Sequence, residues 1–168
     1  LRLTKEALRG RSLNEPVTHT IPRTSRIAFL FAAKAGSEQK PHIGVGMIAQ
    51  VQLGFRADEL TTIRRRDVDI LESYLEPILI ALGTVKLTKC KRKQFVRVTF
   101  AEHFETFMLL RVLVPLIIDP DQLVFCFSYW QYHGTIQRYD SAFGLHIGLS
   151  GHSGRACFAT EAVIIHNK

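Results

Sequence analysis

The spacing of apolar residues changes twice along this chain, and the two changes limit the folds that it can adopt. Up to Asp67 apolar side chains recur at the spacing of helices that bury one face. Between Val68 and Phe100 the pattern becomes short β-prone runs, and from Glu102 onward it is helical again. We therefore expect a mixed α+β fold that is mainly α, with helices packed around a small antiparallel sheet or hairpin.

Local signals predict where the elements begin and end. Thr24 or Ser25 can cap a first helix that runs to about Ala35, and Pro41 suits the first turn of a second helix that ends at Gly54. Further helices are expected over residues 58–65, 102–114, 131–145 and 151–165. Short strands are expected over residues 68–70, 78–85 and 95–100, a hairpin turn over residues 89–93, and another turn over residues 119–121.

Composition favours a single domain with an anionic partner. The chain has 168 residues, 46% of them hydrophobic and 11 of them Phe, which is enough for a sizeable core. Its net charge of +7 favours a polyanion such as nucleic acid over an anionic membrane surface. Much of this charge is concentrated in one stretch without acidic residues, which contains Lys86, Lys89, Lys91, Arg92, Lys93 and Arg97.

The spacing of the cysteines and the length of the apolar runs indicate in which cellular compartment the protein resides. The 3 Cys residues are widely spaced without a C-x-x-C pair, which argues against a disulfide framework or structural zinc and fits a reducing interior. No run of apolar residues reaches membrane-spanning length, and no signal peptide is visible. We expect an intracellular protein without a membrane partner, and we interpret the two chain ends as the limits of a fragment.

His152 and Arg155 are the most suggestive pair near the end of the chain. Residues three apart on a helix project from the same face, so both side chains can address one anionic group. The pair alone has ordinary explanations, because His152 can equally be a helix cap or a core histidine with satisfied hydrogen bonds. Its meaning depends on what precedes it.

Two other motifs precede this pair in the chain. The first is Gly54-Phe55-Arg56-Ala57-Asp58-Glu59-Leu60, followed by Asp67-Val68, and the second is the basic hairpin around Lys89. The third is His152-Ser153-Gly154-Arg155, followed by Phe158-Ala159-Thr160. This order resembles the catalytic domain of the tyrosine recombinase (phage integrase) family, from Arg9 to about Val163. It implies a catalytic-like domain over residues 23–168, incomplete at its C-terminal end, preceded by a linker over residues 1–22.

The resemblance implies a role for each motif in cutting and rejoining double-stranded DNA. Arg56 and Arg155 would grip the nonbridging oxygens of the scissile phosphate, because planar guanidinium groups bind such oxygens in pairs. His152 would exchange protons near neutral pH, and Lys89, or alternatively Lys86, would protonate the leaving 5′ oxygen. The remaining basic residues, Lys86, Lys91, Arg92 and Lys93, would bind DNA.

The resemblance also has implications for cofactors, assembly, cellular location and the nucleophile. It implies that the reaction needs neither a metal nor a nucleotide cofactor. It also implies self-association on DNA. The expected location is the nucleus of a eukaryote, or otherwise the cytoplasm or nucleoid. The family's nucleophilic tyrosine lies beyond H-x-x-R, whereas Tyr74, Tyr129, Tyr132 and Tyr139 all precede His152. We interpret Tyr129, Trp130 and Tyr132 as a packing cluster, and Gly154 as a substitution that weakens the helix carrying Arg155.

Other interpretations of the same residues stay open. Arg56 can simply pair with Asp58 or Glu59 at a helix start, and residues 89–93 can be a solvated turn or a nuclear-import signal. As a whole, the chain can be a catalytically inactive, mobile-element-derived domain that only binds DNA or a partner. A basic helical RNA-binding module would explain the charge but not the order of the motifs.

Overall fold

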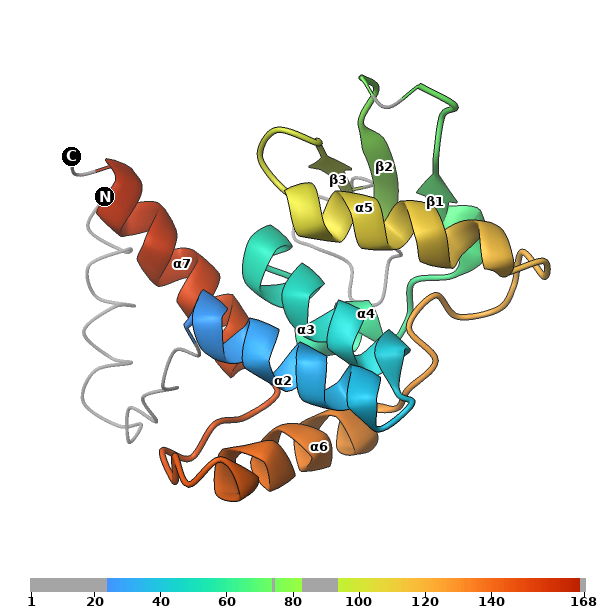
Figure 1. Cartoon of the computed structure of the whole chain (residues 1–168). Coiled ribbons are helices and arrows are strands. Elements are labelled where there is room, and N and C mark those ends of the chain that lie inside the picture. Colours follow the sequence, from blue (N-terminus) through green and yellow to red (C-terminus); the bar gives the residue numbers. More distant parts are fainter. Residues whose placement is uncertain (1–23, 74, 83–93, 167–168) are drawn as a thin grey trace, which may run out of the picture.

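A computed structural model describes residues 24–73, 75–82 and 94–166 as helices arranged around a small sheet (Figure 1). The helices are α2 (Ser25–Ser37), α3 (Pro41–Leu53), α4 (Ala57–Leu60), α5 (Phe104–Leu113), α6 (Tyr129–Ala142) and α7 (Ser153–His166). The strands are β1 (Val68–Asp69), β2 (Ile78–Leu82) and β3 (Gln94–Val98), and the 3-10 turns are η1 (Arg65–Asp67) and η2 (Val114–Leu116). The predicted mainly helical α+β fold is confirmed. The expected linker (1–22) and hairpin turn (89–93) lie outside the described residues.

Both of the first two helices begin where the sequence indicates, and α3 also ends there, whereas α2 runs to Ser37, beyond the expected end near Ala35. The hydroxyl of Thr24 accepts a hydrogen bond from the backbone N–H of Ile27 at 3.4 Å, which caps α2. Pro41 is the first residue of α3, and Gly54 ends that helix in the left-handed conformation with φ 69°.

Helix α3 is the centre of the molecule. Every residue from Ile43 to Val51 is buried, so the helix has no solvent-facing side over that stretch. Two of its glycines allow close packing: a β-carbon on Gly44 would lie 2.9 Å from the carbonyl oxygen of Ala32 in α2, and one on Gly46 would lie 2.8 Å from the ring of Phe127. In Figure 1, α3 accordingly lies between α2, α5 and α7.

The sheet is antiparallel, with strand order β1-β2-β3. Val68 pairs with Ile80, and Ile78 pairs with Val98, so these four buried side chains lie on one face. They join the same core cluster as Phe107 on α5, which crosses the sheet in Figure 1.

The helix expected over residues 58–65 is shorter than predicted, because the backbone after it binds another segment. Helix α4 covers only Ala57–Leu60. Next, the carbonyl of Ile63 accepts a hydrogen bond from the N–H of Val124 at 2.9 Å, and the N–H of Arg65 donates to Gln122 at 2.9 Å. In the expected helix, the N–H of Arg65 would instead donate to the carbonyl of Thr61. We call this pairing of residues 63–66 with residues 120–124 the clasp.

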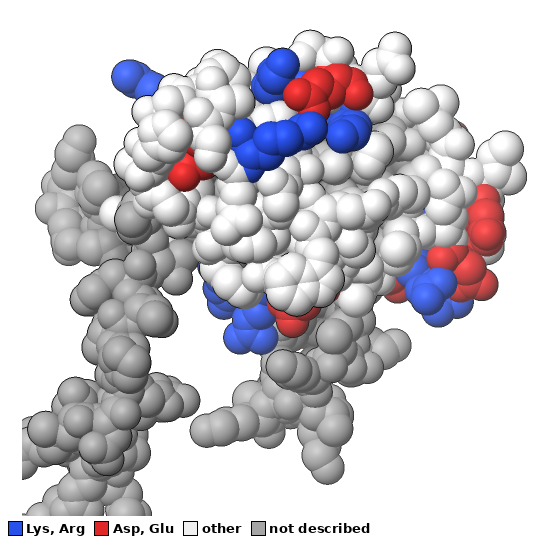
Figure 2. Space-filling view, turned by 90° about the horizontal axis from the view of Figure 1, so that it is seen from below, with Lys and Arg blue, Asp and Glu red and all other residues white. Residues whose placement is uncertain are grey.

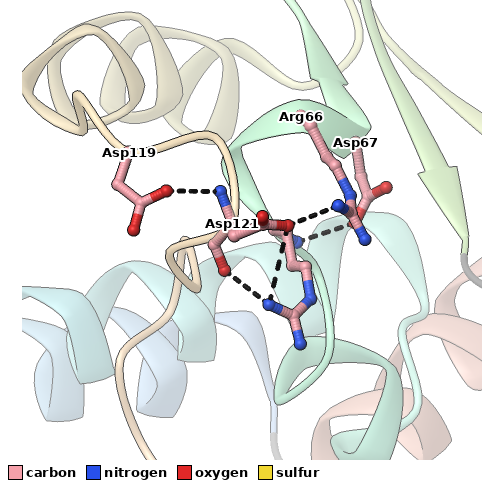
Figure 3. A network of polar contacts seen from close by, with 5 residues as sticks. Arg66, Asp67, Asp119 and Asp121 are labelled. Carbon is pink, nitrogen blue, oxygen red and sulfur yellow. Dashed lines mark hydrogen bonds and ion pairs between the residues drawn. The ribbon is translucent and has the colours of Figure 1, made fainter.

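Side chains reinforce the clasp around Asp121 (Figure 3). The guanidinium groups of Arg64 and Arg66 both contact Asp121, and the former donates to its carbonyl oxygen at 2.6 Å. Asp67 accepts from the backbone N–H of Arg64 at 2.8 Å, while Asp119 accepts from that of Asp121 at 2.9 Å. The predicted turn over residues 119–121 is therefore present.

Helix α6 is displaced toward the N-terminus relative to the prediction of 131–145. It begins earlier because Ser128 and Gln131 form a capping box, each side chain binding the other's backbone N–H at 3.2 and 2.8 Å. It ends at Ala142, and the carboxylate of Asp140 then accepts the N–H groups of Ile147 and Gly148. The ordered loop that follows leads directly into α7.

Candidate active site

Arg56 and Arg155, which are far apart in the sequence, meet at one carboxylate. The Nε atom of Arg56 lies 4.0 Å from Oε1 of Glu59, and Nη1 of Arg155 lies 3.8 Å from Oε2 of the same residue. The two arginine side chains are 52% and 45% exposed, whereas that of Glu59 is 19% exposed. The structure thus brings together the two arginines that the motifs single out and leaves both open to solvent.

The position of Arg56 follows from the chain reversal between α3 and α4. Gly54 turns the chain, and Arg56 then precedes the first residue of α4 as its cap. Glu59 accepts the backbone N–H of Arg56 at 2.7 Å, so the same carboxylate closes the helix start and binds the arginine side chains. Arg56 therefore does pair with Glu59 at a helix start, as one of the open interpretations of the sequence expected.

Close packing of α7 against the end of α3 places Arg155 beside Arg56. A β-carbon on Gly54 would lie 2.6 Å from Cδ1 of Phe158, which is closer than any real contact. Phe158 is one helical turn beyond Arg155, and Gly54 is two residues before Arg56. The absence of a side chain at Gly54 therefore lets the two arginine-bearing segments approach.

A buried glutamine holds the loop that carries His152. Gln50, fully buried on α3, donates from Nε2 to the carbonyl of Gly151 at 2.6 Å and accepts from the hydroxyl of Tyr132 at 2.9 Å. The N–H of Gly151 donates in turn to Nδ1 of His133 at 3.2 Å. Both backbone polar groups of Gly151 are thus held by side chains from other elements, neither of which the motifs indicated.

His152 immediately precedes α7, and its side chain is exposed. Its carbonyl accepts the N–H of Ala156 at 3.2 Å, as a helix cap does, and its own N–H donates to the hydroxyl of Ser150 at 3.3 Å. The exposed ring excludes the core-histidine interpretation and lies one turn from Arg155. Helix α7 continues without a break across Gly154, which is buried.

The prediction that Tyr129, Trp130 and Tyr132 form a packing cluster is wrong for Trp130. Tyr132 is fully buried, but Trp130 is 76% exposed. Tyr129 lies between these extremes, packed against Gly151, with its ring centroid 6.0 Å from that of His152. Successive residues of α6 therefore point both into the core and toward the candidate site.

The described side chains carry no net positive charge. They include half of the 22 Lys and Arg residues but 12 of the 15 acidic ones, counting only described side chains. On the face shown in Figure 2, basic and acidic side chains lie next to one another in small groups separated by uncharged surface. Lys86, Lys89, Lys91, Arg92 and Lys93 lie outside the described residues.

The described residues contain neither a candidate metal site nor a candidate membrane span. No group of three or more His, Cys, Asp and Glu residues there is placed to hold a metal ion. Nor does that part of the chain contain a helix with the length and apolar character to cross a membrane.

Comparisons with known proteins identify the fold. No protein-family model matches the chain, and no curated protein matches its sequence significantly. Among solved structures, it is similar to XerA recombinase, with a TM-score of 0.64 and 18% identity over 89% of this chain and 52% of that one. It is also similar to the XerH site-specific recombinase bound to its difH substrate, with a TM-score of 0.61 and 15% identity over 92% and 46% of the two chains.

A transposon enzyme shares the same fold. The Tn1549 transposon integrase, in complex with a circular intermediate DNA, matches with a TM-score of 0.64 and 14% identity over 91% of this chain and 56% of that one. The chain thus spans about half the length of these structures. Its fold is that of DNA recombinases and integrases, as the resemblance implied.

Proposed function

We propose that this chain binds double-stranded DNA and holds a backbone phosphate between Arg56 and Arg155, as part of a domain that breaks and rejoins DNA. The observation that carries the proposal is the convergence of both guanidinium groups on Glu59, within 4.0 Å. A carboxylate and a phosphate present similar oxygen pairs to arginine, so a place where two arginines bind one carboxylate oxygen each is suited to a phosphate. The recombinase fold supports the same assignment.

The proposed chemistry uses each of the motif residues once. Arg56 and Arg155 stabilise the negative charge that grows on the nonbridging oxygens as the phosphate becomes five-coordinate. His152 exchanges a proton with the attacking or departing hydroxyl, and Lys89, with Lys86 as the alternative, donates a proton to the leaving 5′ oxygen. Lys86, Lys91, Arg92 and Lys93 bind the DNA backbone. In the family that the chain resembles, the attacking hydroxyl belongs to a tyrosine beyond H-x-x-R, and the four tyrosines of these 168 residues, which all precede His152, are not candidates for that role.

One observation favours a second candidate, a catalytically inactive domain that binds DNA or a partner. In the described structure both arginines are already engaged by Glu59, and Tyr132 and Tyr139 are buried in the core. The two candidate functions predict different products when the protein is mixed with DNA. A covalent adduct between the full-length protein and a nicked duplex supports the enzyme, whereas binding without an adduct supports the inactive domain.

Binding itself is tested by titrating a labelled duplex at low salt and following its fluorescence anisotropy. We expect Arg56→Ala and Arg155→Ala to weaken binding several-fold and to reduce its dependence on salt. The matched control is Arg26→Ala, which removes an exposed arginine from α2. An equal loss of DNA affinity in all three variants would show that only the total positive charge matters, and would contradict the proposed site.

Arg111 is unsuitable as the control, although it is also an arginine on a helix. Its guanidinium donates to the carbonyl oxygens of Leu71, Glu72 and Ser73 at 2.9, 2.7 and 3.2 Å. Its removal would release the segment after β1, so a loss of DNA binding there would reflect folding.

A further inference from the structure

Trp130 exposes a large apolar surface beside the candidate site. The indole, in the first turn of α6, is 76% exposed. It meets the ring of Tyr129 edge to face, with centroids 5.3 Å apart and planes at 77°. An exposed tryptophan held by a second ring presents a flat face that is already oriented, which lowers the entropic cost of binding a flat ligand.

Three more rings connect Trp130 to the proposed phosphate site. Tyr129 stacks on His133 with centroids 5.8 Å apart and planes at 6°, and its centroid is 6.0 Å from that of His152. The centroids of Trp130 and His133 are 6.4 Å apart. We call Tyr129, Trp130, His133 and His152 the aromatic shelf. It ends at His152, one helical turn from Arg155, so a molecule on the shelf lies next to whatever Arg155 holds.

His133 adds a directed polar group to the shelf. Its Nδ1 accepts the backbone N–H of Gly151 at 3.2 Å, so the proton of the neutral imidazole is on Nε2. The half-buried ring therefore offers one N–H donor next to aromatic faces. A planar group with hydrogen-bond acceptors on its edge matches this combination, and a nucleobase is such a group.

We propose that the aromatic shelf stacks an unpaired nucleobase that adjoins the phosphate held by Arg56 and Arg155. The proposal rests on the proposed function, since that phosphate fixes the position of the base. A base inside an intact duplex is stacked on both sides, and extracting it costs about as much as one aromatic contact returns. The occupant we infer is therefore a base that is already unpaired, at a gap or a single-stranded end.

The single tryptophan makes this testable without a label. Because the chain contains 1 Trp, fluorescence that is excited at a wavelength that tyrosine does not absorb reports on Trp130 alone. The probes are a hairpin duplex with a short unpaired tail, the same hairpin with an abasic tail of equal charge, and inorganic tripolyphosphate. We expect quenching by the tail that carries bases, and little by the other two.

Variants test the same contact through affinity. We expect Trp130→Ala to weaken binding of the base-carrying tail about tenfold and to leave binding of the abasic tail unchanged. Trp130→Phe should retain most of the affinity, which shows that the fold is intact. The control, Leu116→Ala, removes an apolar side chain that is 74% exposed elsewhere and should change nothing.

Each other outcome is decisive. Equal quenching by the base-carrying and abasic tails would overturn the shelf, since the contact would then be to the backbone. Arginine-dependent DNA binding without any change in Trp130 fluorescence would overturn the shelf and leave the proposed function standing. Absence of binding to every probe would overturn both.

Discussion

Arg155 and Glu59 lie 3.8 Å apart across the junction of α7 and α4, and Arg56 reaches the same carboxylate. Ion pairs with such exposed partners contribute little to stability, on the order of 1 kcal/mol or less. Their larger effect is electrostatic, because the carboxylate offsets part of the positive potential that a phosphate would meet at the proposed site. Glu59 therefore keeps the arginines in place and lowers their attraction for anions.

This dual role predicts that Glu59→Gln binds DNA more tightly. The amide oxygen can still accept the backbone N–H of Arg56, while the negative charge is lost. We expect duplex affinity at low salt to rise several-fold with little change in thermal stability. The matched control is Asp58→Asn, which changes the net charge equally. The same gain in both variants would assign the effect to net charge alone.

Replacement of Gly54 should move the segment that carries Arg56 away from α7, which carries Arg155. Gly54→Ala places a side chain at φ 69°, and its β-carbon overlaps the ring of Phe158. We expect the free energy of unfolding to fall by about 2–4 kcal/mol, together with weaker DNA binding. Chemical denaturation measures the loss. Gly36→Ala, where nothing lies within 4 Å of the added carbon, should instead be neutral or stabilising.

A double variant separates steric overlap from backbone strain at Gly54. If the overlap matters, Phe158→Ala combined with Gly54→Ala should be less destabilised than the sum of the two single variants. Strict additivity would attribute the whole loss to the backbone conformation.

The hydrogen bonds of Gln50 predict a large loss for an apolar replacement of similar size. Gln50→Leu leaves the carbonyl of Gly151 and the hydroxyl of Tyr132 without this partner inside the core. We expect about 2–4 kcal/mol of destabilisation, measured by urea unfolding, and weaker phosphate binding because the loop before His152 is released. Tyr132→Phe removes only one of these bonds and should cost about 1 kcal/mol. Equal losses would contradict a role for the Gly151 contact.

Much of the local structure was predictable because the residues that determine it are neighbours in the chain. Thr24 caps the helix that it precedes, and Pro41 and Gly54 begin and end the next one. The order of helices and strands followed from apolar spacing in the same way. The capping box that starts α6 is equally local, and its Ser-x-x-Gln pattern at residues 128–131 was the available signal.

The remaining features depend on partners that lie far away in the sequence. Helix α4 stops early because Ile63 and Arg65 bind residues of the 120–124 segment. Gln50 and His133 converge on Gly151 from two different helices, and no motif around either residue marks it. Only the fold shows that one carboxylate, Glu59, serves both arginines.

Acid should destabilise the fold through two partly buried histidines. Burial lowers the pKa of His103, against an opposing effect of Glu102, and burial together with Lys40 lowers the pKa of His42. Each folded-state pKa lies below the ordinary value of 6.5, so the unfolded chain binds more protons. The contribution of these two histidines to the free energy of unfolding is therefore fully present above pH 6.5 and is lost as the pH falls through their folded-state pKa values.

Thermal melts between pH 7.5 and 5 measure this dependence. Neutral His103 accepts the N–H of Thr99 on Nδ1 at 3.4 Å, and glutamine offers an acceptor without a titrating group. We expect His103→Gln to show a smaller drop in melting temperature on acidification than the wild type. An unchanged drop would show that His103 does not contribute.

The clasp has a consequence for how the chain can vary in length. It fastens together the two ends of a segment that contains the whole sheet and α5, so the chain leaves the helical part and returns to it at one place. Residues can be inserted into or removed from the β2–β3 connection without changing the separation of Arg56 and Arg155, which α3, α4 and α7 determine. The sequence places Lys89, which we propose as a proton donor, in that connection, so variants with a longer or shorter connection test that proposal without altering the two arginines.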